Sequence, residues 1–478
     1  MGEYKTPGVY IKEKSAFGNS VVEAATAIPA FIGYTEKAVN GNDSLTNVPW
    51  RISSMTEFMQ YFGGAPKLQF EVDIKKYHTD AAIDAESKAI KPAGAILKPE
   101  AQLFQMEVNT NETETLEGKP YKVSYAFCVG GKNPYTLYYN LLLFFANGGG
   151  ACYIVSVGSY TDSPAKKPMT DALDKLTLEQ EITMVVVPEA VKLSVDECKD
   201  VQQQMLSHCG YTMKNRFALF DIYPKEDKNT GIESQIGIFW NNIGSNFLSY
   251  GAAYFPWLNT SVLGNRDLNG TMFTYKDGVC RYRDKFAGID AALPGIVLSF
   301  LIKENQTIAE GEINNEDEGG KSEIITEVPR TDAEIDKTAF HLALYNGSSL
   351  YKQALQSLLK VLNLLPPSSA MAGIYTRVDN SRGVWKAPAN VALNYVESPT
   401  EEIDDDQQAD LNAPMNGKAI NVIRTFRGEG VKVWGARTLD GNSLDWRYIN
   451  VRRTLLFLEE SVKNAARAYV FEPNDAAT

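Results

Sequence analysis

The chain begins with a short alternation of apolar and polar side chains that predicts a strand without an obvious partner. In "YKTPGVYIKEKS" the turn sequence "TPG" comes first, and Val9 and Ile11 then fall on one face of the strand. The small polar stretch "SAFGNS" follows, so we expect a tethered strand rather than a tight hairpin. Because backbone N–H and C=O groups must be paired, the strand needs a sheet edge, and that edge can belong to another molecule. The candidate linking strand is Val9, Tyr10, Ile11 and Lys12.

The middle of the chain alternates apolar strand patterns with helix patterns. Strands are predicted at 27–36, 152–155, 182–190 and 216–223, and helices at 53–64, near 171–176 and at 194–209. Continuous apolar strands separated by helices are typical of a mostly parallel α/β sheet that is covered on both faces. The less periodic, polar stretches 67–132 and 302–335 are interpreted as insertions with exposed surfaces.

Three consecutive glycines in "YTLYYNLLLFFANGGGACYIVSVG" require a choice between a phosphate loop and a helix end. Phosphate loops run from a strand through glycines to a helix, so that free N–H groups at the helix start face the anion. Here the order is helix, glycines, strand. We therefore predict that Gly148 to Gly150 end the helix in a left-handed cap.

Near the C-terminal end, two short strand patterns flank the turn sequence "RGEG" and predict a hairpin. Its side chains are Val422, Ile423, Phe426, Val431, Val433 and Trp434. From the residues alone, this hairpin either completes the sheet of its own domain or supplies edges to other chains.

The helix pattern of "YINVRRTLLFLEES" carries Arg452 and Arg453 at its start, where the helix dipole disfavours cations. One explanation is a structural salt bridge to Asp445, Glu459 or another domain. The other is contact with an acidic surface of a partner. The apolar side of this predicted helix is formed by Leu455, Leu456, Leu458 and Val462.

Composition and charge narrow the functional classes. With 44% hydrophobic and 22% charged residues the chain has ordinary globular composition, and a net charge of −12 disfavours nucleic acid as a general partner. We expect no membrane span and no signal peptide, and we expect the protein to be synthesised in the cytoplasm. Residues 418–467 nevertheless carry ten basic residues against five acidic ones, which favours a local acidic partner.

Candidate chemistry is sparse. Five cysteines without CxxC spacing favour reduced thiols, and His208-Cys209 alone supplies too few ligands for a metal. The acidic run "EEIDDD" at 401–406 lacks the spacing of a calcium loop and is interpreted as a solvated face. No GxSxG, HExxH or GxxxxGK[ST] motif occurs. An α/β enzyme with an unrecognised site remains the alternative hypothesis.

Three stretches near the C-terminal end are more specific: "RGVWKAPAN", "VWGARTL" and "WRYINVRR". Together with "TPGVYIKE", "AAYFPWLN" and "LFFANGGGACYIVSVG" upstream, they resemble tail sheath proteins of contractile phage tails and contractile injection systems. The resemblance implies a structural subunit that forms stacked hexameric rings around an inner tube and contracts to drive that tube through a target envelope. It implies no enzyme activity, cofactor, nucleotide or metal.

The resemblance also implies how subunits are linked. In the family, N-terminal and C-terminal arms of neighbouring subunits add strands to an inner sheet, so the strand from Val9 to Lys12 would pair with another copy. The implied partners are the chain itself, the inner tube, and baseplate and tail terminator proteins, without nucleic acid or membrane insertion. After assembly in the cytoplasm, the protein would be part of a phage tail, an extracellular particle or a membrane-anchored apparatus.

Three domains are expected on this basis. Residues 1–20 form a linking arm, residues 21–377 an outer, mostly parallel α/β domain with both insertions, and residues 378–478 an α+β inner assembly domain completed by exchanged strands. Arg452, Arg453 and Lys463 are candidate tube-facing residues. Family members continue beyond "FEPNDAAT", so the sequence is truncated, or other chains supply the missing strands, or the linkage uses one arm.

Overall fold

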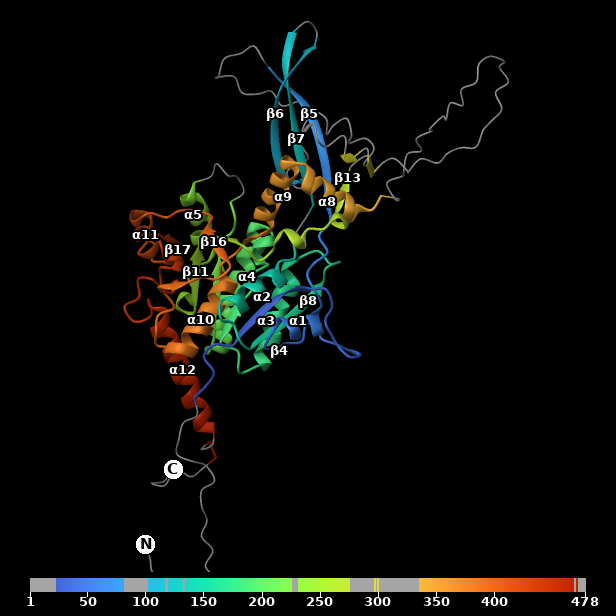
Figure 1. The fold of residues 1–478 in the computed structure, drawn as a ribbon. Coiled ribbons are helices and arrows are strands. Elements are labelled where there is room, and N and C mark those ends of the chain that lie inside the picture. The colour runs from blue at the N-terminus through green and yellow to red at the C-terminus, as the bar shows by residue number, and fades with distance from the viewer. Residues whose placement is uncertain are drawn as a thin grey trace, which may run out of the picture.

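The apolar strand patterns form one large sheet in the computed structural model (Figure 1). The structure describes residues 23–80, 102–116, 119–131, 134–225, 231–275, 296–297, 299–300, 335–467 and 470–471. In spatial order the strands are β15 (Val391–Ala392), β18 (Gly430–Val433), β17 (Ile420–Phe426), β11 (Gly251–Phe255), β10 (Phe217–Asp221), β9 (Met184–Val186), β1 (Pro29–Thr35), β8 (Cys152–Ser159) and β4 (Trp50–Ile52). The run from β17 to β8 is parallel, which confirms the predicted mostly parallel α/β sheet.

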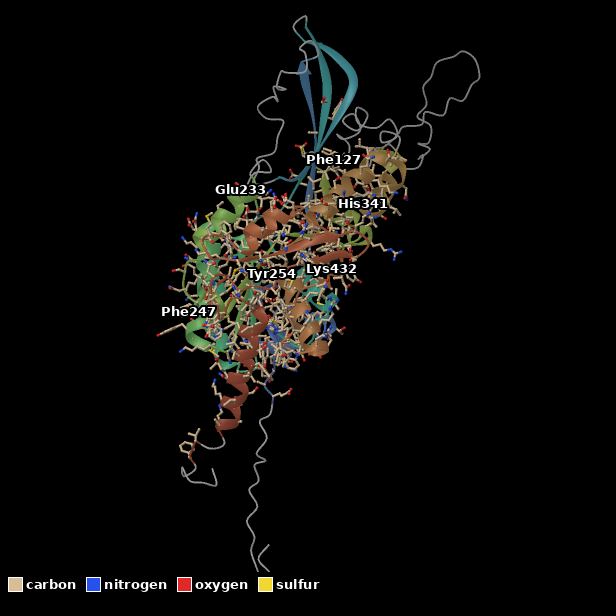
Figure 2. The ribbon with its side chains drawn as sticks, turned by 90° about the vertical axis from the view of Figure 1, so that its left-hand side faces the viewer. Phe127, Glu233, Phe247, Tyr254, His341 and Lys432 are labelled. Carbon is tan, nitrogen blue, oxygen red and sulfur yellow. The ribbon has the colours of Figure 1, made fainter. Side chains whose placement is uncertain are left out.

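Helices cover both faces of this sheet, because the strands are apolar on both sides. One face packs on α1 (Met55–Phe62), α2 (Leu137–Ala146), α10 (Ser368–Arg382) and the start of α12 (Ile449–Ala466). The other face packs on α3 (Lys166–Lys175), α4 (Val195–Ser207), α5 (Ile232–Asn242) and α11 (Asp405–Asn412). Tyr254 of β11 lies inside the body, where its hydroxyl is 2.8 Å from that of Tyr375 (Figure 2).

The glycine triplet ends α2, as predicted. Gly148 has a φ of +98°, a region that side chains rarely adopt, and a Cβ at this position would lie 2.7 Å from the Cβ of Arg377. The close approach brings α10 against the end of α2. The glycines therefore serve helix termination and packing.

Residues 67–132 were predicted to be a polar insertion with little periodicity, but their described part consists mainly of long paired strands. A second sheet has the order β13 (Phe273–Tyr275), β5 (Phe70–Asp80), β7 (Lys119–Gly130) and β6 (Gln102–Leu116). It packs on α8 (Lys337–Gly347) and α9 (Ser349–Leu362), with Phe127 and Val129 in a core of its own. Figures 1 and 2 show this unit at the end of the molecule opposite α12. The predicted insertion 302–335 lies outside the described residues except for Ile335.

Two small sheets complete the architecture. One is a hairpin of β2 (Val39–Asn40) and β3 (Asp43–Ser44). The other has β12 (Leu258–Thr260) between β14 (Leu364–Leu365) and β16 (Val396–Pro399).

The structure does not separate into packed domains at the expected boundary between residues 377 and 378. That boundary falls inside α10, and β17 from the expected inner domain pairs with β11 from the expected outer domain. Long-range strand pairing thus joins both parts in one sheet. The expected linking arm, 1–20, lies outside the described residues.

Two buried carboxyl groups fix the starts of the central helices. Glu189, after β9, accepts hydrogen bonds from the backbone N–H groups of Thr136 and Leu137 at the start of α2 and from that of Tyr34, at 2.6–2.9 Å. Asp221, at the end of β10, accepts from the backbone N–H and hydroxyl of Ser368 at the start of α10. Burial raises the pKa of each carboxyl group to about 7, although these hydrogen bonds favour the charged form.

This raised pKa predicts a pH dependence of stability. A carboxyl group that holds its proton more tightly in the folded than in the unfolded chain stabilises fully below about pH 4.5, and the contribution is lost as pH rises through about 7. The Glu189→Gln variant removes this titrating group. It keeps Lys192, whose charge lowers the pKa of Glu189, and Asp221, the other buried carboxyl group. We expect urea unfolding between pH 4.5 and 8 to show a less negative slope of unfolding free energy against pH in the variant. Equal slopes would contradict the prediction.

Candidate assembly interface

The predicted hairpin is present in the structure. Strands β17 and β18 are antiparallel, with Phe426 opposite Gly430 and Ile423 opposite Val433. Gly428 and Gly430 have φ values of +80° and +79°, which the tight turn requires.

The hairpin side chains divide between core and surface. Phe426 and Trp434 form a ring pair at 4.5 Å, and Trp434 is partly exposed. The side chains of Val422, Ile423, Val431 and Val433 are buried in the sheet's two cores. The hairpin thus completes the sheet of its own chain.

One edge of β17 is nevertheless open among the described residues. Strand β11 pairs with β17 only from Ile420 to Val422, whereas β18 pairs with it as far as Phe426. From Ile423 to Phe426, β17 is therefore paired on the β18 side alone. An unpaired length of strand is a place where a strand from another chain can add.

Arg453 does not face a partner in this structure. It is buried, and its guanidinium donates to both carboxylate oxygens of Asp379 at 2.9 and 2.6 Å and to the carbonyl oxygen of Thr26 at 2.8 Å. The guanidinium also lies 4.6 Å from the Tyr375 ring. Burial opposes the charge, but attraction to Asp379 outweighs it, so the pKa of Arg453 is raised. The salt-bridge explanation holds for Arg453, with Asp379 in place of the predicted Asp445 or Glu459.

Arg452 is also buried, between the rings of Tyr250 and Trp446 at 4.0 and 4.5 Å. The prediction that Arg452 and Arg453 face a tube is therefore wrong for this structure, because aromatic packing and an internal ion pair take both side chains into the body. Lys463 is exposed and contacts Glu460 at 3.1 Å.

The predicted apolar side of α12 is only partly buried. Leu456 packs in the body, whereas Leu458 and Val462 are exposed. Figure 1 shows the cause: beyond its first turns, α12 leaves the body. Apolar exposure on a helix is a feature of contact surfaces.

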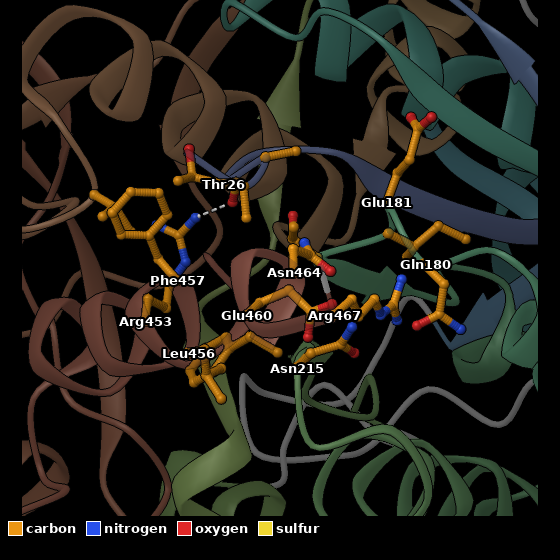
Figure 3. A pocket seen from close by; sticks show the side chains of 16 residues that line it. Thr26, Gln180, Glu181, Asn215, Arg453, Leu456, Phe457, Glu460, Asn464 and Arg467 are labelled. Atoms are coloured by element: carbon orange, nitrogen blue, oxygen red, sulfur yellow. Dashed lines mark hydrogen bonds between the residues drawn. The ribbon is translucent and has the colours of Figure 1, made fainter. Parts of the chain in front are cut away.

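A cavity of about 270 Å³ lies between α12 and the segment before β1 (Figure 3). Its polar lining includes Glu181, Asn215, Glu460 and Arg467, and Asn215 Oδ1 and Glu460 Oε1 have no hydrogen-bond partner. Its lining contains no histidine, cysteine or serine.

The His208-Cys209 pair is used for packing. His208 Nε2 lies 2.9 Å from Nη1 of the buried Arg216, and burial lowers the pKa of His208 to about 4. Within the described ranges, no group of three or more His, Cys, Asp or Glu residues could hold a metal ion. None of the helices in that part of the chain is long and apolar enough to cross a membrane.

Comparison with known proteins adds independent information on this architecture. No family model matches the chain. A tail sheath protein of Burkholderia phage BcepMu is 33% identical over 117 residues, which are 23% of this chain and 24% of the relative. A prophage major tail sheath protein of Pseudomonas aeruginosa is 27% identical over 100 residues, which are 20% of this chain and 25% of that protein.

The resemblance to the tail sheath family is confirmed. The chain spans about a quarter of the length of these sheath relatives. Among solved structures, the cryo-EM structure of the anti-feeding prophage baseplate in its contracted state matches 99% of this chain and 80% of its own, with 21% identity and a TM-score of 0.53. At that identity the match establishes the fold.

Two residues important to the sheath-like fold were missed by sequence reasoning. Asp379 follows the mostly small and apolar residues of "AMAGIYTRVD", and a buried carboxylate must be matched by a cation or by hydrogen-bond donors. That pattern could have identified the pair with Arg453. Glu189 follows a strand of three valines in "MVVVPEA", yet nothing local indicates that its three donors come from two distant segments.

Proposed function

We propose that this chain is a structural subunit of a contractile sheath, stacked as hexameric rings around an inner tube. The sheath stores energy in a metastable extended assembly, and repacking of bistable subunit interfaces drives the tube through a target envelope. The role is structural rather than catalytic and needs no cofactor. The observation that carries the proposal is the similarity to the Burkholderia phage sheath protein.

The linkage proposal follows from the open edge of β17. Residues 9–12 of another copy supply the linking strand, and the hairpin of β17 and β18 receives strands from neighbours. Support comes from the pairing of β17 on one side only between Ile423 and Phe426. In the proposed sheath, residues 21–377 face the outer surface and residues 378–478 face the inner tube, even though both parts share one sheet.

The proposed partners are further copies of the chain, an inner tube protein, and baseplate and terminator proteins. Of the three candidate tube-facing residues, only Lys463 is exposed, so it alone keeps that proposed role. The particle assembles in the cytoplasm and then functions as a phage tail, an extracellular particle or a membrane-anchored apparatus. Nucleic acid and membrane insertion have no part in this proposal.

Electron microscopy of the purified chain tests the proposal. Helical tubes or stacked rings are expected, and a monomer at all concentrations would count against it. Deleting residues 1–15 should abolish polymers and change the melting temperature little, because the arm binds another copy. A strand of this length adds few hydrogen bonds at about 1 kcal/mol each, so strength comes from repetition. Polymers from the truncated chain would remove the arm from the mechanism, and its unfolding would place the strand in its own subunit.

A further inference from the structure

Three arginines lie close to aromatic rings where the chain enters α12. Arg452 is held between Tyr250 and Trp446, as described above. The guanidinium groups of Arg447 and Arg437 lie 5.0 and 5.9 Å from the ring of Tyr448. We call this the arginine–aromatic cluster, and it comprises Tyr250, Arg437, Trp446, Arg447, Tyr448 and Arg452.

Among the described residues, the cluster has no counter-charge. None of its three guanidinium groups has a carboxylate within 4 Å among the described residues, in contrast to Arg453 and Arg424. Moreover, Arg447 Nε and Arg452 Nε are buried without a hydrogen-bond partner. Buried guanidinium nitrogens normally find acceptors, so the cluster is an incomplete ionic site.

The rim of the cluster is apolar and exposed. Leu444 and Tyr448 are 82% and 41% exposed, and Val451 on the first turn of α12 is 37% exposed. Arg437 and Arg447 are half-buried beside this rim. A partner that fits must therefore bring both carboxylates and an apolar side chain.

The matching surface occurs on α11 of the same chain. Asp406 and Asp410 are exposed one helical turn apart and have no ion-pair partner within the described ranges. Met415, three residues beyond this helix, is fully exposed. We call Asp406, Asp410 and Met415 the α11 acidic face.

The two surfaces lie near each other in the fold, because Gln408 of α11 donates to the carbonyl oxygen of Trp434 at 2.8 Å and Trp434 is three residues before Arg437. In Figure 1 both elements, α11 and α12, lie on the same side of the body, with α11 nearer to the β5–β7 end than the start of α12 is. A contact between two different surfaces of two copies is head-to-tail, and it extends into a helical chain when the rotation between copies does not close a ring.

We propose that the arginine–aromatic cluster of one copy binds the α11 acidic face of a second copy. Arg437 and Arg447 pair with Asp406 and Asp410, and Met415 packs on Tyr448 and Leu444, since methionine sulfur contacts aromatic rings favourably. This inference rests on the proposed self-assembly and names the contact that stacks the subunits.

Charge reversal tests the contact. Arg447→Glu and Asp406→Arg should each raise the concentration needed for polymer formation at least tenfold, and the combined variant should recover to within about threefold, because the pair is restored with opposite polarity. Lys167→Glu on α3 is the matched control and should change nothing. Melting temperatures establish that all variants fold. An effect of Arg447→Glu without one of Asp406→Arg, or without rescue, assigns the cluster to another acidic partner and overturns the inference.

Disulfide capture gives a readout that does not depend on tubes. A chain with Tyr448→Cys and Met415→Cys should form a ladder of covalent oligomers on mild oxidation, whereas each single variant lacks the opposing cysteine and should show no covalent oligomers, like the chain without either substitution. Cys128, Cys152, Cys198 and Cys209 are buried, and Cys280, which lies outside the described residues, is replaced by serine in every chain used for this experiment. A ladder without tubes would support the contact and contradict the sheath proposal. Tubes without a ladder would support the sheath proposal and contradict the contact.

Discussion

Asp379→Ala is expected to lower the free energy of unfolding by about 3–5 kcal/mol, a large part of the stability of an ordinary domain. The variant leaves the guanidinium of Arg453 buried without its carboxylate, while the contacts to Thr26 and Tyr375 remain. An uncompensated buried charge costs much more than the net value of the pair. Urea unfolding followed by circular dichroism measures the difference.

The matched control is Asp405→Ala, which removes the partner of Arg424. The side chain of Asp405 is 91% exposed, so this ion pair is solvated and its loss should cost less than about 1 kcal/mol. Replacing Asp379 and Arg453 together by Leu and Met should recover much of the loss, because no charge is then left buried. Equal effects of Asp379→Ala and Asp405→Ala would contradict the assignment.

Glu189→Ala is expected to cost about 3–9 kcal/mol at pH 8. It leaves three buried backbone N–H groups, those of Tyr34, Thr136 and Leu137, without an acceptor, and each such group costs about 1–3 kcal/mol. Since Glu189 connects the end of β9 with β1 and α2, we also expect faster hydrogen exchange at these three amides.

Glu36→Ala provides the comparison for Glu189. Glu36 also accepts a backbone N–H bond, from Gly64 at 2.7 Å, but in an exposed position where water can replace it. Its loss should cost less than about 1 kcal/mol. A cost for Glu189→Ala as small as that for Glu36→Ala would mean that water reaches the site.

The central α/β fold could be predicted because its elements carry strong local signals. Continuous apolar strands and the Ser194–Glu197 capping box at the start of α4 are examples. The strands β6 and β7 were not recognised, since "QMEVNTNETETLEG" is polar and only residues such as Phe127 and Val129 enter a core. Their strand conformation depends on pairing with neighbours, which propensity does not reveal.

The candidate interface was predicted in part for a similar reason. The hairpin of β17 and β18 follows from its glycines and alternation, whereas its pairing with β11 joins segments that are far apart in sequence. Charge counting identified Arg452 and Arg453 but could not distinguish a surface cation from a buried one. That distinction depends on Asp379, which lies 74 residues away.

The place of β17 beside β11 has a consequence for synthesis on the ribosome. Strand β11 is buried on both faces, and its partner edge is absent until residues 420–422 have been made. At usual elongation rates, this interval lasts about 10–30 s. During it, an apolar strand edge is open to other nascent chains on the same polysome. Slower elongation after β11 should therefore increase aggregation, and chaperones that shield strand edges should matter most in this interval.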